Sequence, residues 1–324
     1  MSSGVGPAAE GVRVDWSELP VAVRAGIGDV CGSPVESVRT QRGGFSPGVA
    51  ARVCCVDGQR YFVKAVCEEP NAQSYRAHRR EAEVLAELGR LPGAGTLRFP
   101  ALRGIFDDGL WVALVLEDVD GHQPVLPWQA GELARVVSAL QQMAEVLTPP
   151  PIAAAAAQDA YADSFMGWRK LGEADGSLAD QLDPWSRRHL ERLADVELTW
   201  PQYAAGQTLL HTDLRADNLL ITRDCVVVVD WPWACVGSPL LDLVGFAPSV
   251  KMQGGPDPAE LLRMTVAGRG ADPDAVAALA CALAGYFTEA ARNPAPPGLP
   301  TLRAFQAAQG VVARRWVADL LRLR

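Results

Sequence analysis

Two carboxylates and one amide, those of Asp213, Asn218 and Asp230, lie close together in the sequence around an apolar run at residues 226–229. The run is continuous and β-branched, which predicts a buried strand with Asp230 at its end. A turn at residues 222–224 would fold the segment into a hairpin and bring the three side chains to one side. Carboxylate and amide oxygens are hard donors, and they suit Mg²⁺ that is bound together with the phosphates of a substrate.

The spelling of this segment narrows the chemistry. Residues 211–218 match H-x-D-L-x-x-x-N, residues 228–231 are V-V-D-W, and residues 237–243 are G-S-P-L-L-D-L. Kinases have the same order of parts: a loop Asp that accepts a hydroxyl proton, then an Asn and a second Asp that hold the metal. The segment resembles the aminoglycoside phosphotransferase family more than the protein kinases, because an aromatic residue, and not Phe-Gly, follows the second Asp.

This resemblance assigns roles to the three side chains. It implies that Asp213 orients and deprotonates the hydroxyl of a substrate, and that Asn218 and Asp230 hold Mg²⁺. It also implies that Asp242 bonds the catalytic loop and not the substrate. The family often has Gly-Asp-Pro where this chain has Gly-Ser-Pro, but Ser is a good N-cap and Pro suits the first helical position, so a helix should still begin at Pro239.

Other polar residues of the loop have more than one interpretation. We expect His211 to bond the backbone and shape the loop, since it is worse placed than Asp213 to act as a base. Asp217 is expected to shape the loop or to face solvent. Arg215 could offset charge on a transferring phosphoryl group, but an Arg at the surface is the commoner case and the one we expect.

A Gly-rich turn early in the chain is the candidate phosphate loop. Strand-like residues flank it within residues 38–53, and the turn includes Gly43, Gly44, Ser46 and Gly48. Glycines let the backbone approach a phosphate and direct N–H groups at it, although most such turns only connect strands. In the resembled family this loop often has the form G-G-x-S, which predicts that Ser46 and Gly48 contact the nucleotide. The intervening Pro lacks an N–H and removes one donor.

A lysine follows in the next hairpin, which Asp57-Gly58 predicts. Lys64 lies inside the apolar strand 60–66, where a Lys is most often an edge residue that faces solvent. Kinase-like folds place a phosphate-binding Lys here, and such a Lys needs a carboxylate partner. Residues 73–91 have helical periodicity, with Glu81 on the apolar side. We predict that Glu81 pairs with Lys64; the alternative is a solvated charge that pairs locally along its helix.

Strands are also predicted at residues 102–106 and 110–116, on either side of an Asp-Asp-Gly turn. The second strand runs into an acidic linker that ends in Gly121, like the hinge between the lobes of kinase-like folds. The resemblance implies that backbone groups near Glu117 and Val119 bind the adenine edge of ATP.

The C-terminal half is predicted to be mainly helical. Apolar periodicity and Pro or Gly breakers indicate helices at residues 132–147, 159–171, 184–198, 258–268, 272–291 and 302–323. A short helix within residues 15–30 should place Val21, Val23 and Ile27 in the core, while residues 1–11 are small and polar and are expected to be disordered.

Bulk composition excludes several classes of protein. The chain has 324 residues, 49% of them hydrophobic, which is enough for one large domain or two lobes. Its net charge of −8 argues against general nucleic-acid binding and is compatible with a cationic substrate. The seven cysteines form no C-x-x-C motif, so we expect a reduced, cytoplasmic protein without structural zinc. No signal peptide or membrane span is expected.

These patterns predict an α+β, two-lobed protein-kinase-like fold. A small antiparallel-sheet lobe, residues 1–118, would bind nucleotide, and a mainly helical lobe, residues 119–324, would carry catalysis and substrate binding. The resemblance extends from about Val38 to Leu243. It implies transfer of the γ-phosphoryl group of ATP, or of GTP, with Mg²⁺, to a hydroxyl of a small molecule.

The acceptor is left open by the sequence. An antibiotic is the first hypothesis, and a metabolic alcohol such as choline, homoserine or a sugar is the alternative. A nucleotide-binding module without catalysis is an alternative of another class. The complete set of Lys64, Glu81, Asp213, Asn218 and Asp230 argues against that module, and the lack of Asp-Phe-Gly and Ala-Pro-Glu argues against a protein kinase. The oligomeric state is likewise open.

Overall fold

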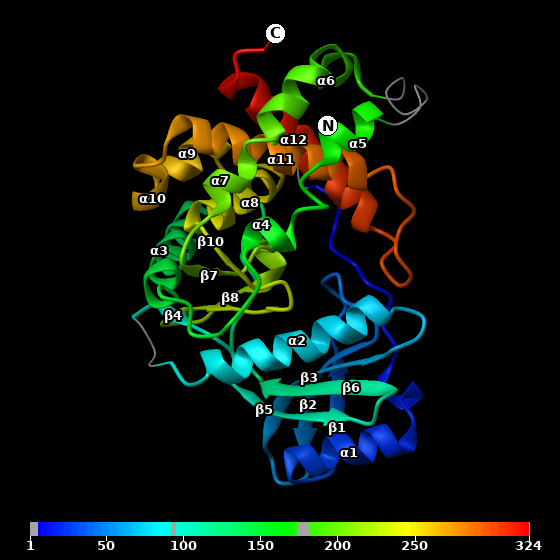
Figure 1. Ribbon diagram of the computed structural model, residues 1–324. Coiled ribbons are helices and arrows are strands. Elements are labelled where there is room, and N and C mark those ends of the chain that lie inside the picture. The colour runs from blue at the N-terminus through cyan, green and yellow to red at the C-terminus, as the bar shows by residue number, and fades with distance from the viewer. Residues whose placement is uncertain (1–5, 92–94, 174–181, 324) are drawn as a thin grey trace.

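A computed structural model describes residues 6–91, 95–173 and 182–323, and its elements form two lobes (Figure 1). The smaller lobe contains an antiparallel sheet with the strand order β1-β2-β3-β6-β5. The strands are β1 (Val35–Thr40), β2 (Val49–Cys55), β3 (Arg60–Cys67), β5 (Leu102–Asp107) and β6 (Trp111–Glu117). The predicted hairpins are therefore present, and the mixed α+β fold is confirmed.

Two helices cover opposite faces of this sheet, α1 (Val21–Cys31) and α2 (Ala72–Leu88). Successive side chains of a strand point to opposite faces, so Val63 and Ala65 of β3 pack with α1 whereas Val66 packs with α2. Within α1, the predicted core residues Val23 and Ile27 are buried. The third, Val21, is 73% exposed, because it lies on the outer side of the helix.

The larger lobe is mainly helical, as predicted. Its helices are α3 (Ala130–Val146), α4 (Ala157–Ala160), α5 (Gly167–Glu173), α6 (Pro184–Glu197), α7 (Trp200–Ala204), α8 (Pro239–Met252), α9 (Pro258–Arg263), α10 (Val266–Arg269), α11 (Pro273–Ala290) and α12 (Leu302–Leu320). Helix α8 begins at Pro239, as predicted, with the Ser238 hydroxyl accepting from the Leu240 amide.

Two of the predicted helices are broken, and each break has a local cause. The helix expected at residues 159–171 is divided into α4 and α5, because buried Glu197 caps a new N-terminus by accepting from the amides of Trp168 (3.0 Å) and Arg169 (3.1 Å). The helix expected at residues 258–268 is divided into α9 and α10, because Thr265 caps α10 by accepting from the Gly268 amide (2.9 Å).

Short strands carry the polar segment of the larger lobe. They are β7 (Thr208–Leu210), β8 (Leu219–Ile221), β9 (Val226–Val228) and β10 (Cys235–Gly237). Strands β8 and β9 form the predicted hairpin, and β7 pairs with β10. A short strand that precedes β5 in the sequence, β4 (Leu97–Arg98), adds to the hairpin in parallel with β9.

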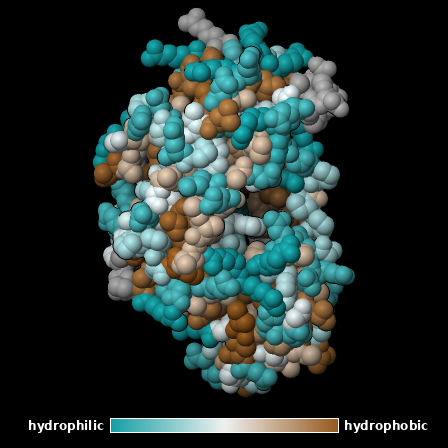
Figure 2. Space-filling model, viewed as in Figure 1, coloured by the Kyte–Doolittle hydropathy of each residue, from teal (hydrophilic) through white to brown (hydrophobic). Residues whose placement is uncertain are grey.

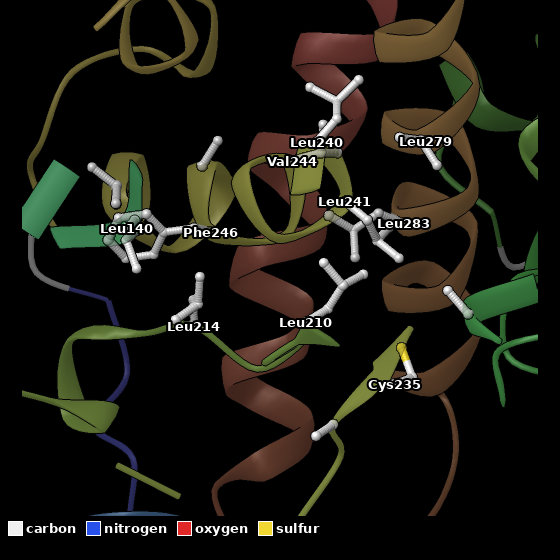
Figure 3. Close-up of a cluster of buried hydrophobic side chains, with 14 of the residues drawn as sticks. Leu140, Leu210, Leu214, Cys235, Leu240, Leu241, Val244, Phe246, Leu279 and Leu283 are labelled. Carbon is white, nitrogen blue, oxygen red and sulfur yellow. The ribbon is translucent and has the colours of Figure 1, made fainter. Parts of the chain in front are cut away.

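The core of the larger lobe lies directly behind these strands. Figure 3 shows Leu210 and Leu214 among side chains of α8 and α11, including Leu241, Val244 and Leu283. On the face shown in Figure 2, hydrophilic side chains predominate and apolar ones are scattered between them. In the described part of the chain, no helix is long and apolar enough to cross a membrane.

The N-terminal segment departs from its prediction. Residues 1–5 lie outside the described residues, but Ala9, Glu10 and Gly11 are in contact with the rest of the chain, and the expected disorder is wrong for them. The Gly44 amide donates to the Ala9 carbonyl (2.9 Å), and the Glu10 amide donates to Thr301 Oγ1 (3.1 Å). Figure 1 shows this blue segment running from the helical lobe to the sheet lobe.

Candidate active site

The loop after β7 carries Asp213 and is anchored in the core on both sides. Leu210 and Leu214 are 0% and 3% exposed, and they hold the loop against the core of the larger lobe (Figure 3). The Asp213 side chain between them is 28% exposed. Burial of the flanking leucines thus fixes the backbone while the carboxylate stays accessible.

Asp242, on α8, fixes the amides of this loop. Its carboxylate accepts hydrogen bonds from the amides of His211 (2.9 Å) and Thr212 (2.6 Å). The His211 ring accepts from the Asp213 amide (3.2 Å) and donates to the Val229 carbonyl (2.9 Å). Burial lowers the pKa of His211, which keeps the ring neutral and suits both contacts. The predicted contacts of His211 and Asp242 are confirmed.

Two residues of the site have left-handed backbone, Thr212 with φ 65° and Asp230 with φ 70°. A side chain in this region costs about 1–3 kcal/mol and persists only where neighbouring contacts impose it. The Thr212 hydroxyl accepts from the Tyr161 hydroxyl (2.6 Å) and donates to the Trp233 carbonyl (3.0 Å). Strain that is held in place by surrounding bonds is typical of functional sites.

Arg215 lies between the carboxylates of Asp213 and Asp217. Its Nη1 donates to Asp213, and its Nε and Nη2 each donate to Asp217 at 3.0 Å. Arg215 is only 8% exposed, so the expectation of an Arg at the surface is wrong. Burial raises the pKa of Asp213 to about 6, although the charge of Arg215 acts to lower it. Such a carboxylate is ionised at neutral pH and basic enough to accept a proton.

Aromatic side chains from both lobes surround the Arg215 guanidinium. It lies 5.2 Å from the ring centroid of Phe45 and 5.8 Å from that of Phe305. Phe45 is at the tip of the Gly-rich turn, and its ring packs edge-on against Phe305 of α12, with centroids 5.1 Å apart. The turn of the sheet lobe therefore touches both the loop that carries Asp213 and helix α12 of the larger lobe.

Lys64 joins the two lobes electrostatically. Its Nζ donates to both oxygens of Glu81 (2.8 and 2.9 Å) and to Asp230 Oδ1 (2.6 Å). The predicted pairing with Glu81 is confirmed, and the edge-strand alternative is wrong because β3 lies between β2 and β6. Burial favours the neutral amine, but the charges of Asp230 and Glu81 outweigh it and raise the pKa of Lys64. Burial acts to raise the pKa of Asp230, yet the charge of Lys64 lowers it to about 2.

Asn218 and Asp230 have oxygens that fit a divalent cation. Asn218 Nδ2 donates to the Asp213 carbonyl (2.8 Å), and its amide oxygen has no hydrogen bond among the residues that the structure describes. Asp230 Oδ1 contacts Lys64, and within the described residues Oδ2 has no hydrogen bond. The Val229 amide donates to the Asn218 carbonyl (3.0 Å), which keeps the two residues adjacent. Two such oxygens suit Mg²⁺, which takes one or two protein ligands and completes its shell with water and phosphates.

A cleft of roughly 390 Å³ separates the sheet from the hairpin of β8 and β9, a size that accommodates a small-molecule ligand. Its lining includes most of the residues predicted from the sequence: Ser46, Lys64, Glu81, Glu117, Val119, Asn218 and Asp230. Asp213 does not line this cleft and lies behind Asn218, on the side of Arg215.

The predicted hinge forms one end of the cleft. The Glu117 amide donates to the Ala101 carbonyl (2.9 Å). The Val119 carbonyl already accepts from Arg52 Nη2 (3.1 Å) and from the Gly121 amide (3.0 Å), whereas the Val119 amide has no hydrogen bond in the described part of the chain. The amide is therefore the backbone group of Val119 that a ligand can use.

The Gly-rich turn differs from its prediction at one residue. Gly48 does not line the cleft; it is buried with φ 87°, and a Cβ there would lie 2.3 Å from the Ala65 carbonyl oxygen. Its amide donates to the Val12 carbonyl (3.2 Å) and is not available to a phosphate. The predicted contact of Gly48 with nucleotide is corrected to close packing of the turn on β3.

Sequence reasoning missed two residues of this region. Arg13 lines the cleft, and its guanidinium donates to the carbonyls of Gly43 and Ser46. Tyr161 supports Thr212 from the other side of the loop. No local pattern marks either residue, because Arg13 lies in a polar N-terminal segment and Tyr161 lies in a turn between α4 and α5.

The arrangement can bind a phosphorylated ligand and accept a proton. Lys64, which contacts two carboxylates, faces the cleft together with Asn218 and Asp230, whose oxygens could bind a metal ion. Asp213, an ionised aspartate of raised pKa, adjoins Asn218. These are the parts that orient a phosphoryl group and deprotonate an incoming nucleophile.

Comparison with known families gives a match to the phosphotransferase enzyme family over residues 43–279, which is more than half of the chain. The matched segment includes the Gly-rich turn, Lys64, Glu81 and the catalytic hairpin. No curated protein matches the chain.

Solved structures share the fold at low sequence identity. A putative fructosamine-3-kinase from Thermobifida fusca is 21% identical, with a TM-score of 0.56 over 93% of this chain and 98% of that chain. A thermostable mutant of aminoglycoside phosphotransferase APH(4)-Ia, in ternary complex with AMP-PNP and hygromycin B, is 13% identical with a TM-score of 0.58, covering 94% and 98%. Amicoumacin kinase hAmiN, in complex with AMP-PNP, Ca²⁺ and amicoumacin, is 12% identical with a TM-score of 0.55, covering 86% and 88%. These likenesses establish the fold.

Proposed function

This chain belongs to the phosphotransferase enzyme family, and we propose that it moves the γ-phosphoryl group of ATP to a hydroxyl group of a small molecule. One observation carries the proposal. Lys64 of the sheet lobe reaches across the cleft to Asp230 of the catalytic hairpin, 2.6 Å away, while Glu81 holds it from behind. A cation placed beside a metal-type carboxylate is the arrangement that a metal–triphosphate requires.

Each residue has a distinct task in this reaction. Lys64 binds the phosphates, and Asn218 and Asp230 hold Mg²⁺, which neutralises phosphate charge when bound. Asp213 orients the acceptor hydroxyl and takes its proton as the oxygen attacks the γ-phosphorus. The bond between that phosphorus and the β–γ bridging oxygen breaks, and ADP leaves. Arg215 offsets charge near Asp213.

The adenine and phosphate contacts come from the backbone of the sheet lobe. We assign the adenine edge to the Val119 amide and the backbone at Glu117, and a phosphate contact to the amide of Ser46. This division makes residues 1–118 the nucleotide-binding part and residues 119–324 the catalytic and substrate-binding part. Segment 9–14 is the exception, since it contacts both.

For the acceptor, an antibiotic is the first candidate. Solved structures of the same fold include enzymes in complex with hygromycin B and with amicoumacin, which supports this substrate class. The putative fructosamine-3-kinase of the same fold supports a sugar derivative as the alternative. The net charge of −8 is compatible with a cationic substrate of either kind.

The test is a screen of acceptor-dependent ADP release with antibiotics, sugars and amino alcohols, run with ATP and with GTP. We expect one class to stimulate ADP release in the wild type. Asp213→Ala should abolish the stimulated rate and leave nucleotide binding intact. Phosphorylated product formed by Asp213→Ala would refute the role of this residue, and nucleotide binding without any acceptor would favour a non-catalytic module.

A further inference from the structure

The N-terminal segment, residues 9–14, lies along the Gly-rich turn and accepts hydrogen bonds from two of its amides. The Gly44 amide donates to the Ala9 carbonyl (2.9 Å), and the Gly48 amide donates to the Val12 carbonyl (3.2 Å). The Val14 amide donates back to the Gly48 carbonyl (3.1 Å). The segment lies outside residues 43–279, the part of the chain that matches the family.

The same segment is tied to the helical lobe. The Thr301 hydroxyl accepts from the Glu10 amide and donates to the Glu10 carbonyl, both at 3.1 Å. The Val12 amide donates to the Gly298 carbonyl (2.8 Å). Residues 9–14 are therefore held in place by hydrogen bonds to both lobes, next to the Gly-rich turn that lines the cleft.

These contacts leave the Gly-rich turn short of donors for phosphate. Phosphate loops bind anions through backbone N–H groups, but here Gly44 and Gly48 are engaged and Pro47 has no N–H. Within the described residues, the amides of Gly43, Phe45 and Ser46 are the ones in this turn that have no hydrogen bond. Lys64 adds one positive charge, and that charge is already balanced by Glu81 and Asp230.

Arg13 brings a further cation to the turn, and its guanidinium is held against the turn's own backbone. Its guanidinium donates to the carbonyls of Gly43 and Ser46 from within the cleft that Lys64 and Asp230 also line. Those two bonds use one N–H on each terminal nitrogen, so each retains another N–H. Arg13 Nε is buried and has no partner among the residues that the structure describes. The remaining terminal N–H groups of Arg13 are therefore the ones that a phosphate in the cleft could accept from.

We propose that Arg13 is a further nucleotide-binding residue, whose guanidinium contacts the β- and γ-phosphates of the bound nucleotide. The inference rests on the proposed function for the presence of a nucleotide in the cleft. Carbonyls of the N-terminal segment occupy the amides of Gly44 and Gly48, which then cannot donate to phosphate. The same segment supplies the guanidinium of Arg13, which can donate in their place. Guanidinium groups suit this task because several N–H donors match phosphate oxygens at once.

Arg13→Gln tests the inference through the binding of ATP, ADP and AMP, each measured calorimetrically with Mg²⁺. Loss of charge-assisted hydrogen bonds should weaken ATP about ten-fold to a hundred-fold, weaken ADP less, and leave AMP unchanged. Arg13→Lys should recover part of the ATP affinity. Arg39→Gln is the matched control, because Arg39 is exposed at the rim of the same cleft and its replacement removes the same charge. We expect the affinity for ATP to change less than about two-fold in this variant.

Thr301→Val provides a second variant that leaves Arg13 intact. It removes both bonds to Glu10 with little change in shape, so the segment loosens and ATP should weaken by a smaller factor than in Arg13→Gln. Equal losses for ATP and AMP in Arg13→Gln would show a role only in folding the turn and would overturn the inference, as would unchanged ATP affinity. Absence of ATP binding in the wild type would instead refute the proposed function.

Discussion

Replacing Lys64 by Met removes the only positive charge that Glu81 contacts in the described structure. Lys64 Nζ makes two bonds to Glu81, whose side chain is 2% exposed, and one to Asp230. Breaking a buried ion pair by removing one partner costs about 3–5 kcal/mol, because the other charge stays buried without compensation. Total stabilities are about 5–15 kcal/mol, so Lys64→Met should lose a large part of the free energy of unfolding.

The assay is urea denaturation at pH 7 and pH 5, with Arg80→Met as the matched control. Arg80 lies on α2, the helix of Glu81, and pairs with Glu83 at 2.9 Å, but the Glu83 side chain is 63% exposed. The free energy of unfolding of Arg80→Met should therefore fall by only about 0.2–0.5 kcal/mol. Burial raises the pKa of Glu81, and loss of the lysine raises it further. A carboxyl with a raised folded-state pKa stabilises the folded state as pH falls.

The deficit of Lys64→Met should therefore shrink between pH 7 and pH 5. In the wild type the contribution of Asp230, whose pKa is about 2, is present above its unfolded-state pKa and is lost only as pH falls through the acid range. A deficit below about 1 kcal/mol at pH 7, or a deficit that widens toward pH 5, would refute the reasoning that Lys64 compensates a buried carboxylate.

Three further predictions concern the catalytic loop, the α8 residue that anchors it, and the packing of α12 against the Gly-rich turn. The acid limb of the pH profile of kcat/KM should have an apparent pKa near 6, with activity lost as Asp213 is protonated. Arg215→Gln removes a charge that lowers this pKa, so the limb should move to higher pH. A limb displaced to lower pH would contradict the assignment. Asp242→Asn, which weakens two loop bonds to a carboxylate, should reduce the free energy of unfolding by about 1–3 kcal/mol and lower kcat more than nucleotide affinity; unchanged kcat would contradict its role in shaping the loop. Phe305→Ala empties a site that is 2% exposed and should cost about 3–5 kcal/mol in a urea titration; a loss below 1 kcal/mol would show that the ring is not tightly packed.

Local patterns account for the parts of the site that were predicted correctly. The resemblance to kinase-like folds assigns Lys64 and its need for a carboxylate partner, and helical periodicity in α2 selects Glu81 as that partner. The spacing of His211, Asp213 and Asn218 within one loop, followed by a strand, predicts the catalytic hairpin. These features depend on residues that are close in the sequence or on elements that are adjacent in it.

The features that were missed depend on contacts between distant residues. Glu10 and Thr301 are 291 residues apart, and nothing in the polar N-terminal segment indicates that it would pack on the Gly-rich turn. The break between α4 and α5 depends on Glu197, which caps the second helix from another element. The expectation that Arg215 lies at the surface follows the commoner case for an Arg. Its burial involves Phe45 of the other lobe, a contact that the local sequence does not indicate.

Mg²⁺-dependent binding of ATP to three forms of the protein tests the central claim most directly, since it requires no knowledge of the acceptor. The wild type and Asp213→Ala should bind ATP more tightly when Mg²⁺ is present, and by a similar factor. Asp230→Ala should lose this dependence on Mg²⁺ while its fold is retained. If Asp230→Ala keeps the full Mg²⁺ dependence, or if Asp213→Ala loses ATP binding, these residues do not form the phosphoryl-transfer site proposed here.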